Sequence, residues 1–84
     1  MTAREKLLRV FLQQEDKEWF GADLMDEAKV NSGALYPVLL DLEQDGMLKS
    51  RWEPEEKVDD KPRRRAYSLT HRGIVRGKNE VNLH

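Results

Sequence analysis

The basic side chains near the end of this chain are the residues whose types and spacing best suit chemistry. Between residues 61 and 78 the sequence has seven lysines and arginines and no aspartate or glutamate. They are Lys61, Arg63, Arg64, Arg65, Arg72, Arg76 and Lys78. Guanidinium groups donate paired hydrogen bonds to phosphate or carboxylate oxygens, and ammonium groups attract the same anions as point charges. We therefore expect this segment to bind a polyanion, with Lys61 and Arg63 to Arg65 as the contact residues.

The remaining polar residues do not form a pattern typical of catalysis or metal binding. The 84 residues contain no cysteine, which excludes thiol chemistry and disulfide bonds. The two histidines, His71 and His84, are not spaced as a metal-binding pair, and no combination of serine, histidine and aspartate indicates a nucleophile. We expect no enzymatic activity, no metal site and no cofactor.

The formal net charge of −1 hides an uneven distribution of charge. Residues 15 to 60 contain fourteen acidic and five basic residues, whereas residues 61 to 84 contain seven basic and one acidic residue. The near-neutral total therefore does not argue against a nucleic-acid partner. The longest apolar runs, such as residues 38 to 40, are three residues long and far too short to cross a membrane, and the first 20 residues lack the apolar stretch of a signal peptide. We expect a cytoplasmic protein with no membrane partner.

The elements that must position the basic residues begin with three helices. A first helix is expected over residues 3 to 14 with Thr2 as its N-cap, and a second over residues 21 or 22 to 28. The third carries apolar residues at helical spacing from residue 35 to 42, is capped by Asn31 or Ser32, and ends at Gly46. Pro37 removes one backbone hydrogen bond, so we expect an irregular first turn. Trp19 and Phe20 precede the second helix and are expected to be buried.

Two strands and a last helix follow. Residues 48 to 52 and 65 to 69 alternate as strands do, and eleven mostly charged residues separate them, which predicts a hairpin with a long exposed loop. The alternation points Arg64 away from the side of Arg63 and Arg65. Trp52 and Tyr67 are expected to pack in the hairpin and core rather than to stack on bases. Thr70 should cap the final helix.

The order of these elements predicts a helix-turn-helix unit followed by a wing. In such a unit the second helix lies in the major groove and its first residues meet the base edges. The residues offered outward at that helix start are small or polar, which allows close approach to the duplex: they are Asn31, Ser32, Gly33 and Ala34. The basic hairpin supplies flanking contacts to the backbone or minor groove.

Three sequence segments also match the pattern of a known family. They are Ser32-Gly-Ala-Leu-Tyr-Pro-Val-Leu-Leu-Asp-Leu-Glu-Gln-Asp-Gly46, Ser50-Arg-Trp-Glu53 and Lys61-Pro-Arg-Arg-Arg-Ala-Tyr-Ser-Leu-Thr-His-Arg-Gly73. In this order and spacing, over most of residues 21 to 73, the chain resembles the PadR-like family of bacterial winged helix-turn-helix transcriptional regulators.

The resemblance implies a repressor that binds operator DNA as a homodimer. It implies DNA contacts from the helix start and the wing, namely from Ser32, Gly33, Ala34, Tyr36 and Pro37, and from Arg63, Arg64 and Arg65. Two features depart from the family. Asp41 is acidic where relatives often have a basic residue nearby, and the sequence ends 14 residues after Thr70, where relatives usually continue into a helical region that dimerises and often helps bind an effector.

The sequence therefore predicts one α+β, mostly helical, winged helix-turn-helix domain over residues 1 to 84. It is expected to bind a pseudo-palindromic double-stranded operator as a homodimer in the bacterial cytoplasm, on the nucleoid. Surplus apolar residues in the first and last helices are the expected dimer contacts: Leu8, Val10, Leu12, Val81 and Leu83. A small-molecule effector is left open.

One alternative is a winged-helix module that binds proteins and not DNA, as the acidic middle segment and Asp41 would allow. An acidic surface around Tyr36 would favour it, and a basic surface would favour DNA. Tyr36 itself has two interpretations, a core aromatic residue or a phosphate contact, and its place beside Leu35, off the apolar stripe, favours the second.

Overall fold

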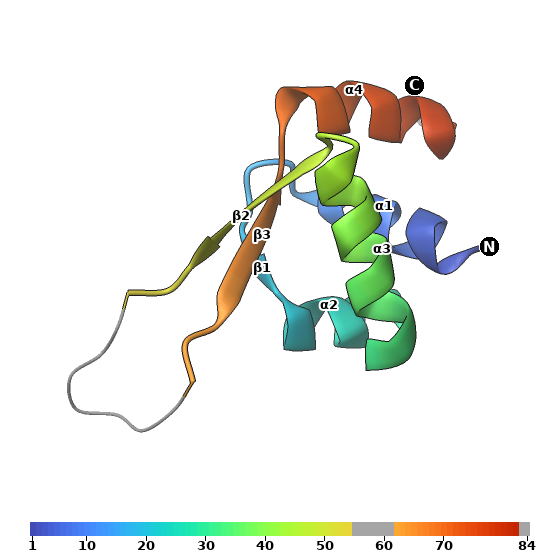
Figure 1. The fold of residues 1–84 in the computed structure, drawn as a ribbon. Helices are drawn as coiled ribbons and strands as arrows, with labels where there is room; N and C mark the ends of the chain where they lie inside the picture. Colours follow the sequence, from blue (N-terminus) through green and yellow to red (C-terminus); the bar gives the residue numbers. More distant parts are fainter. Residues whose placement is uncertain (55–61, 83–84) are drawn as a thin grey trace.

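Helices and short strands alternate along the chain in this computed structural model, which describes residues 1–54 and 62–82 (Figure 1). The described residues form the elements α1 (Ala3–Gln13), β1 (Trp19–Phe20), α2 (Gly21–Ala28), α3 (Ser32–Gln44), β2 (Leu48–Trp52), β3 (Arg65–Leu69) and α4 (His71–Glu80). The predicted helices and the two predicted strands are confirmed to within a residue or so. Most of the loop expected between the strands, residues 55–61, lies outside the described residues.

The ends of the helices explain why the elements begin where the sequence indicates. Thr2, Asn31 and Thr70 each accept a hydrogen bond from the backbone N–H three residues on, so each satisfies an N–H that has no partner in its own helix. Each such cap typically stabilises its helix by about 1 kcal/mol. At the other end of α3, Gly46 has a φ of 74°, a conformation that glycine adopts without strain.

The region around Pro37 differs from the prediction. We expected an irregular first turn, but Ser32–Gln44 is α-helical throughout, with Pro37 inside it. The turn stays regular because it is held from the cap, since the Asn31 carbonyl accepts from both Ala34 and Leu35. Pro37 removes one bond further along the helix without disturbing this start.

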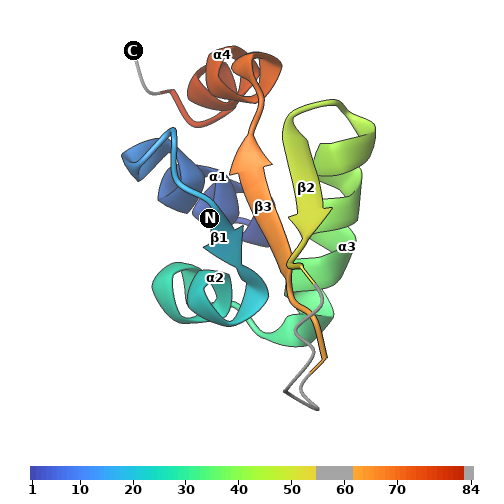
Figure 2. The same cartoon turned by 90° about the vertical axis from the view of Figure 1, so that its left-hand side faces the viewer.

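The sheet has a third strand that the sequence interpretation missed. Trp19 is buried as expected, whereas Phe20 is only half-buried. Both residues pair with β3, Trp19 opposite Tyr67 and Phe20 opposite Ala66. The strand order is β1-β3-β2, so β3 is central and has a neighbouring strand along each edge (Figure 2). A two-residue strand has no alternation to detect, and it forms here because β3 offers it a free edge.

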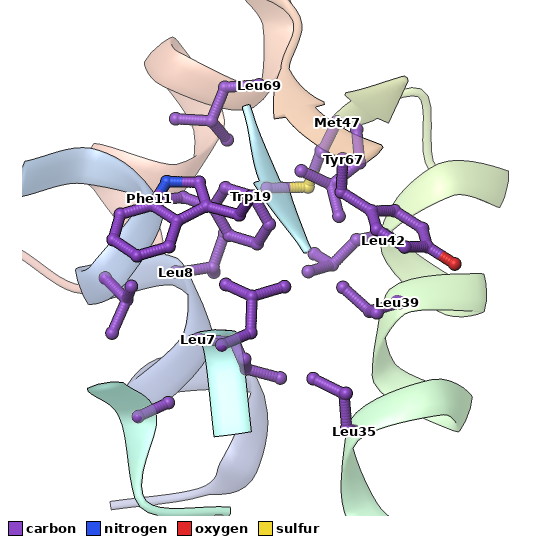
Figure 3. Close-up of a cluster of buried hydrophobic side chains, with 14 of the residues drawn as sticks. Leu7, Leu8, Phe11, Trp19, Leu35, Leu39, Leu42, Met47, Tyr67 and Leu69 are labelled. Atoms are coloured by element: carbon purple, nitrogen blue, oxygen red, sulfur yellow. The ribbon is translucent and has the colours of Figure 1, made fainter. Parts of the chain in front are cut away.

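The core lies between the helices and the sheet. α1, α2 and α3 bring leucines inward against Trp19 of β1 and against Tyr67 and Leu69 of β3 (Figure 3). The largest fully buried side chains are Phe11, Leu7, Leu8, Leu24, Leu35, Leu39, Leu42 and Met47. This packing fixes the angle between α3 and the hairpin, and so places the start of α3 and the wing at one end of the molecule, with α4 at the other (Figure 1).

The residues expected to form a dimer interface are mostly used inside the protomer. Leu8, Val10 and Val81 are 0%, 5% and 3% exposed, so they offer no surface to a second copy. Leu12 is partly buried, and Leu83 lies outside the described residues. The reason is the close approach of α4 to α1: a Cβ placed on Gly77 would lie 3.5 Å from both Leu8 and Leu12 side-chain carbons. Packing between the first and last helices within one chain has taken the apolar surface that the sequence interpretation assigned to dimerisation.

Candidate nucleic-acid interface

The start of α3 presents an exposed surface of small and polar residues. Asn31, Ser32, Gly33, Tyr36 and Pro37 are exposed, while Ala34 is half-buried. The side-chain oxygen of Asn31 caps the helix by accepting a hydrogen bond from the Ala34 N–H at 2.9 Å. The expected contact residues of this segment are therefore brought together, with Asn31 also acting as a cap.

Tyr36 is a surface residue, as its position off the buried stripe predicts. It is 52% exposed, whereas Leu35, directly before it, and Leu39, one helical turn on, are almost fully buried. Its hydroxyl lies against the start of α2, where a Cβ placed on Gly21 would be 2.9 Å from the Tyr36 oxygen. The absence of a side chain at Gly21 lets the phenol ring lie there.

Arg64 is bound within the wing by Glu53. Its Nε donates to Glu53 Oε1 at 2.8 Å, its Nη2 to Oε2 at 3.1 Å, and its backbone N–H to Oε1 at 3.0 Å. The guanidinium also lies 3.8 Å from the centre of the Phe20 ring. These hydrogen bonds hold the pKa of the Glu53 carboxyl below its ordinary value. Arg64 is thus a structural residue of the wing as much as a surface cation.

Arg65 connects the wing to α3. Its Nε donates to Ser50 Oγ at 2.8 Å, Ser50 Oγ donates to Glu43 Oε2 at 2.9 Å, and Arg65 Nη2 lies 3.4 Å from the same carboxylate oxygen. Arg64 and Arg65 therefore bind different partners, in accord with the strand alternation. The chain of contacts orients the hairpin relative to the end of α3.

Arg63 differs from its two neighbours. It is exposed and makes no ion pair with any residue in 1–54 or 62–82. Lys61, the fourth expected contact of the wing, lies outside the described residues. Among the three wing arginines, Arg63 is accordingly the one whose charge no described carboxylate offsets.

A groove of about 510 Å³ separates the start of α3 from the wing. Its lining comes from five elements and the residues before β3: Phe20, Gly21, Ala22, Met25, Tyr36, Trp52, Arg63, Arg64, Arg65 and Tyr67. Three of these are arginines and none is acidic. The lining beside Tyr36 is therefore cationic, with Arg63 as the arginine that no described carboxylate offsets, and this sign favours a polyanion over a basic protein partner.

Trp52 is a groove residue that the sequence interpretation assigned to packing. Tyr67 is buried as expected, but Trp52 is 54% exposed. Strand alternation could not distinguish them, because β3 is central in the sheet and β2 is at its edge. The feature that would have indicated exposure is the position of Trp52 in its strand. Trp52 is the last residue of β2, where the strand is no longer covered by the core.

Two kinds of site are absent from the described part of the chain. Residues 1–54 and 62–82 contain no group of three histidine, cysteine or carboxylate side chains able to hold a metal ion. None of the helices in those ranges is long and apolar enough to cross a membrane.

Comparison with known proteins agrees with this geometry. A model of the transcriptional regulator PadR-like family matches residues 14–79, which is most of the chain. The chain belongs to this family. It is therefore a winged-helix transcriptional regulator and not an enzyme. The family resemblance inferred from the residues of α3 and the wing is confirmed.

Solved structures show the fold of this PadR-like regulator in other proteins. A PadR-like transcription factor described as from bacteroid fragilis is 23% identical, with a TM-score of 0.73 over 92% of this chain and 74% of that one. A PadR family regulator from Eggerthella lenta is 24% identical, with a TM-score of 0.71 over 93% and 70% of the two chains. MepR of S. aureus, solved in a DNA-binding conformation, is 12% identical, with a TM-score of 0.73 over 96% and 56%. A search of curated proteins finds no match.

Proposed function

We propose that this PadR-like regulator binds double-stranded DNA in a sequence-specific manner and represses transcription by occupying its operator. The observation that carries the proposal is the groove between Tyr36 and the wing, which is lined by three arginines and by no acidic residue. The exposed start of α3 lies on one side of this groove. A duplex is the polyanion whose major groove accepts a helix of this kind.

Affinity and sequence preference come from different residues in this proposal. Arg63 and the first backbone N–H groups of α3, at Ser32 and Gly33, bind phosphates, because the first N–H groups of a helix have no carbonyl partner one turn earlier. Gly33, Ala34 and Pro37 bring the backbone close to the base edges and, with the amide of Asn31, set the sequence preference. Tyr36 donates its hydroxyl to a phosphate.

We infer that two copies bind together, on a pseudo-palindromic site with half-sites about one helical turn apart. The face available for pairing is the outer side of α4, where Val75 is 48% exposed at the end opposite the wing (Figure 1). We propose this face as the dimer interface in place of Leu8, Val10 and Val81, which are buried within the protomer. The proposed repressor acts in the bacterial cytoplasm, on the nucleoid.

Selection of bound sequences from a random double-stranded DNA pool tests the proposal. Enrichment of an inverted repeat is expected, and sedimentation of the complex should give two chains for each site. Tyr36→Ala and Gly33→Glu provide loss-of-binding variants, and Gln13→Ala, at an exposed position of α1 outside the groove, serves as a folded control. Recovery of the unselected base composition after repeated rounds would contradict sequence-specific binding.

A further inference from the structure

Trp52 is an exposed indole next to the proposed DNA surface. It is 54% exposed, whereas the other tryptophan of the chain, Trp19, is 3% exposed. Single apolar side chains on a surface are ordinary, but a cluster of them indicates a contact surface. The neighbours of Trp52 therefore decide how its exposure is interpreted.

Those neighbours make the groove both aromatic and cationic. Tyr36, Phe20 and Tyr67 line it together with Trp52, and Arg63 to Arg65 line it as well. A surface that combines apolar ring faces with guanidinium groups complements a polymer that alternates apolar rings with anions. The sugar-phosphate backbone of DNA has this composition, since each deoxyribose lies between two phosphates.

The position of the Trp52 ring is held by its cross-strand partner. Trp52 pairs with Arg65 in the β2–β3 register, and the Arg65 guanidinium carbon lies 5.3 Å from the centre of the indole. Ser50 in turn anchors Arg65 through a 2.8 Å hydrogen bond. The ring is thus oriented before any partner arrives, which lowers the entropy lost on binding.

We propose that Trp52 contacts DNA directly, packing its indole against a deoxyribose of the backbone strand that enters the groove while Arg63 binds a neighbouring phosphate. The inference rests on the proposed function and deepens it by assigning a contact residue that carries no charge. Trp52 then contributes to affinity by burying apolar surface, and Arg65 acts as its positioning residue.

Fluorescence of the two tryptophans tests the contact. Short double-stranded DNA fragments of random sequence serve as the probe at low salt, and the anisotropy of labelled DNA establishes binding separately. Quenching by acrylamide should decrease in the wild-type chain when DNA is bound, because the exposed indole becomes covered. In Trp52→Phe, which retains only the buried Trp19, DNA should leave quenching unchanged.

Affinity measurements separate ring packing from charge. Trp52→Ala should weaken DNA binding about fivefold, at the lower end of what aromatic contacts to nucleic acids contribute, and Trp52→Phe should lose less. The salt dependence should stay at the wild-type slope, since no cation is removed. Gln13→Ala, which shortens an exposed uncharged side chain at the end of α1 and outside the groove, is the control.

Four outcomes would overturn the inference. Unchanged acrylamide quenching with DNA bound, or wild-type affinity in Trp52→Ala, would remove Trp52 from the interface while leaving DNA binding intact. A lower salt slope in Trp52→Ala would show that the variant acts through Arg65 and not through ring packing. If anisotropy detects no binding by the wild-type chain, the proposed function fails, and this inference fails with it.

Discussion

The carboxylate of Glu53 accepts three hydrogen bonds of 2.8 to 3.1 Å from Arg64, one from its backbone N–H and two from its guanidinium group. Glu53 directly follows β2, and Arg64 directly precedes β3. The ladder continues past the strands at this point, because the Glu53 N–H also donates to the Arg64 carbonyl at 2.8 Å. A carboxylate in this place shapes the wing and at the same time offsets a positive charge beside the proposed DNA surface.

Replacing Glu53 by Gln should therefore strengthen non-specific DNA binding. The variant removes one negative charge from the DNA side and the ion pair with Arg64, so binding to random DNA should tighten and depend more steeply on salt. Fluorescence anisotropy over a salt series measures both effects. Glu15→Gln, which breaks an ion pair with Lys78 away from the groove, changes the net charge equally and should have a smaller effect. Equal effects of the two variants would mean that only net charge matters.

Replacing Arg63 by Ala should weaken binding to all DNA sequences. Loss of one phosphate contact lowers the slope of log affinity against log salt by about 0.9 for duplex DNA. Because Glu53 and Glu43 already bind Arg64 and Arg65, their alanine variants should lower the slope less than Arg63→Ala does. A larger decrease for Arg64→Ala would show that DNA displaces Glu53. Folding of each variant is checked by circular dichroism.

Gly73 and Gly77 of α4 should respond differently to alanine. A Cβ on Gly73 would lie 1.9 Å from the Met47 carbonyl oxygen, whereas one on Gly77 would lie 3.5 Å from its nearest side-chain carbons. Gly73→Ala must displace α4 or the turn before β2, and it should lower the free energy of unfolding by about 1 to 3 kcal/mol or more. Gly77→Ala should be neutral or stabilising by up to about 1 kcal/mol, since alanine favours helix. Urea unfolding measures both, and similar losses in the two variants would contradict the close approach at residue 73.

Acid should weaken the contact between α1 and α4. Arg4 donates to Glu80 at 2.8 and 2.9 Å, and these hydrogen bonds lower the pKa of the Glu80 carboxyl below its ordinary 4.5. A carboxyl with a lowered pKa stabilises the folded state above its ordinary pKa, and this stabilisation is lost as the pH falls through the lowered value. Because solvent reaches part of both side chains, which are 29% and 32% exposed, the effect should be at most about 1 kcal/mol.

Glu80→Gln measures this contribution. Its difference from wild type in the free energy of unfolding should be present at pH 7 and should shrink below about pH 4. A difference that stays constant from neutral to acid pH would assign the effect to packing and not to the ion pair.

Local sequence signals determined much of this protein. Thr2, Asn31 and Thr70 cap their helices because a side chain reaches a backbone N–H three residues away, and such signals depend only on near neighbours. The apolar spacing from Leu35 to Leu42 likewise defines α3 and leaves Tyr36 outside the buried stripe. The wing strands, the basic segment and the PadR-like motif were readable for the same reason.

Tertiary structure alone decided which of these surfaces remain available. The strand at Trp19 forms only because the strand that contains Tyr67, 48 positions later, offers an edge for pairing. Leu8 of α1 is buried against α4, a helix that begins at residue 71. Glu53 and Trp52 took their places beside the groove through strand register, which no single segment encodes. Periodicity shows which residues of an element are apolar, but burial depends on which other element arrives to cover them, and that is set by contacts between residues far apart in the chain.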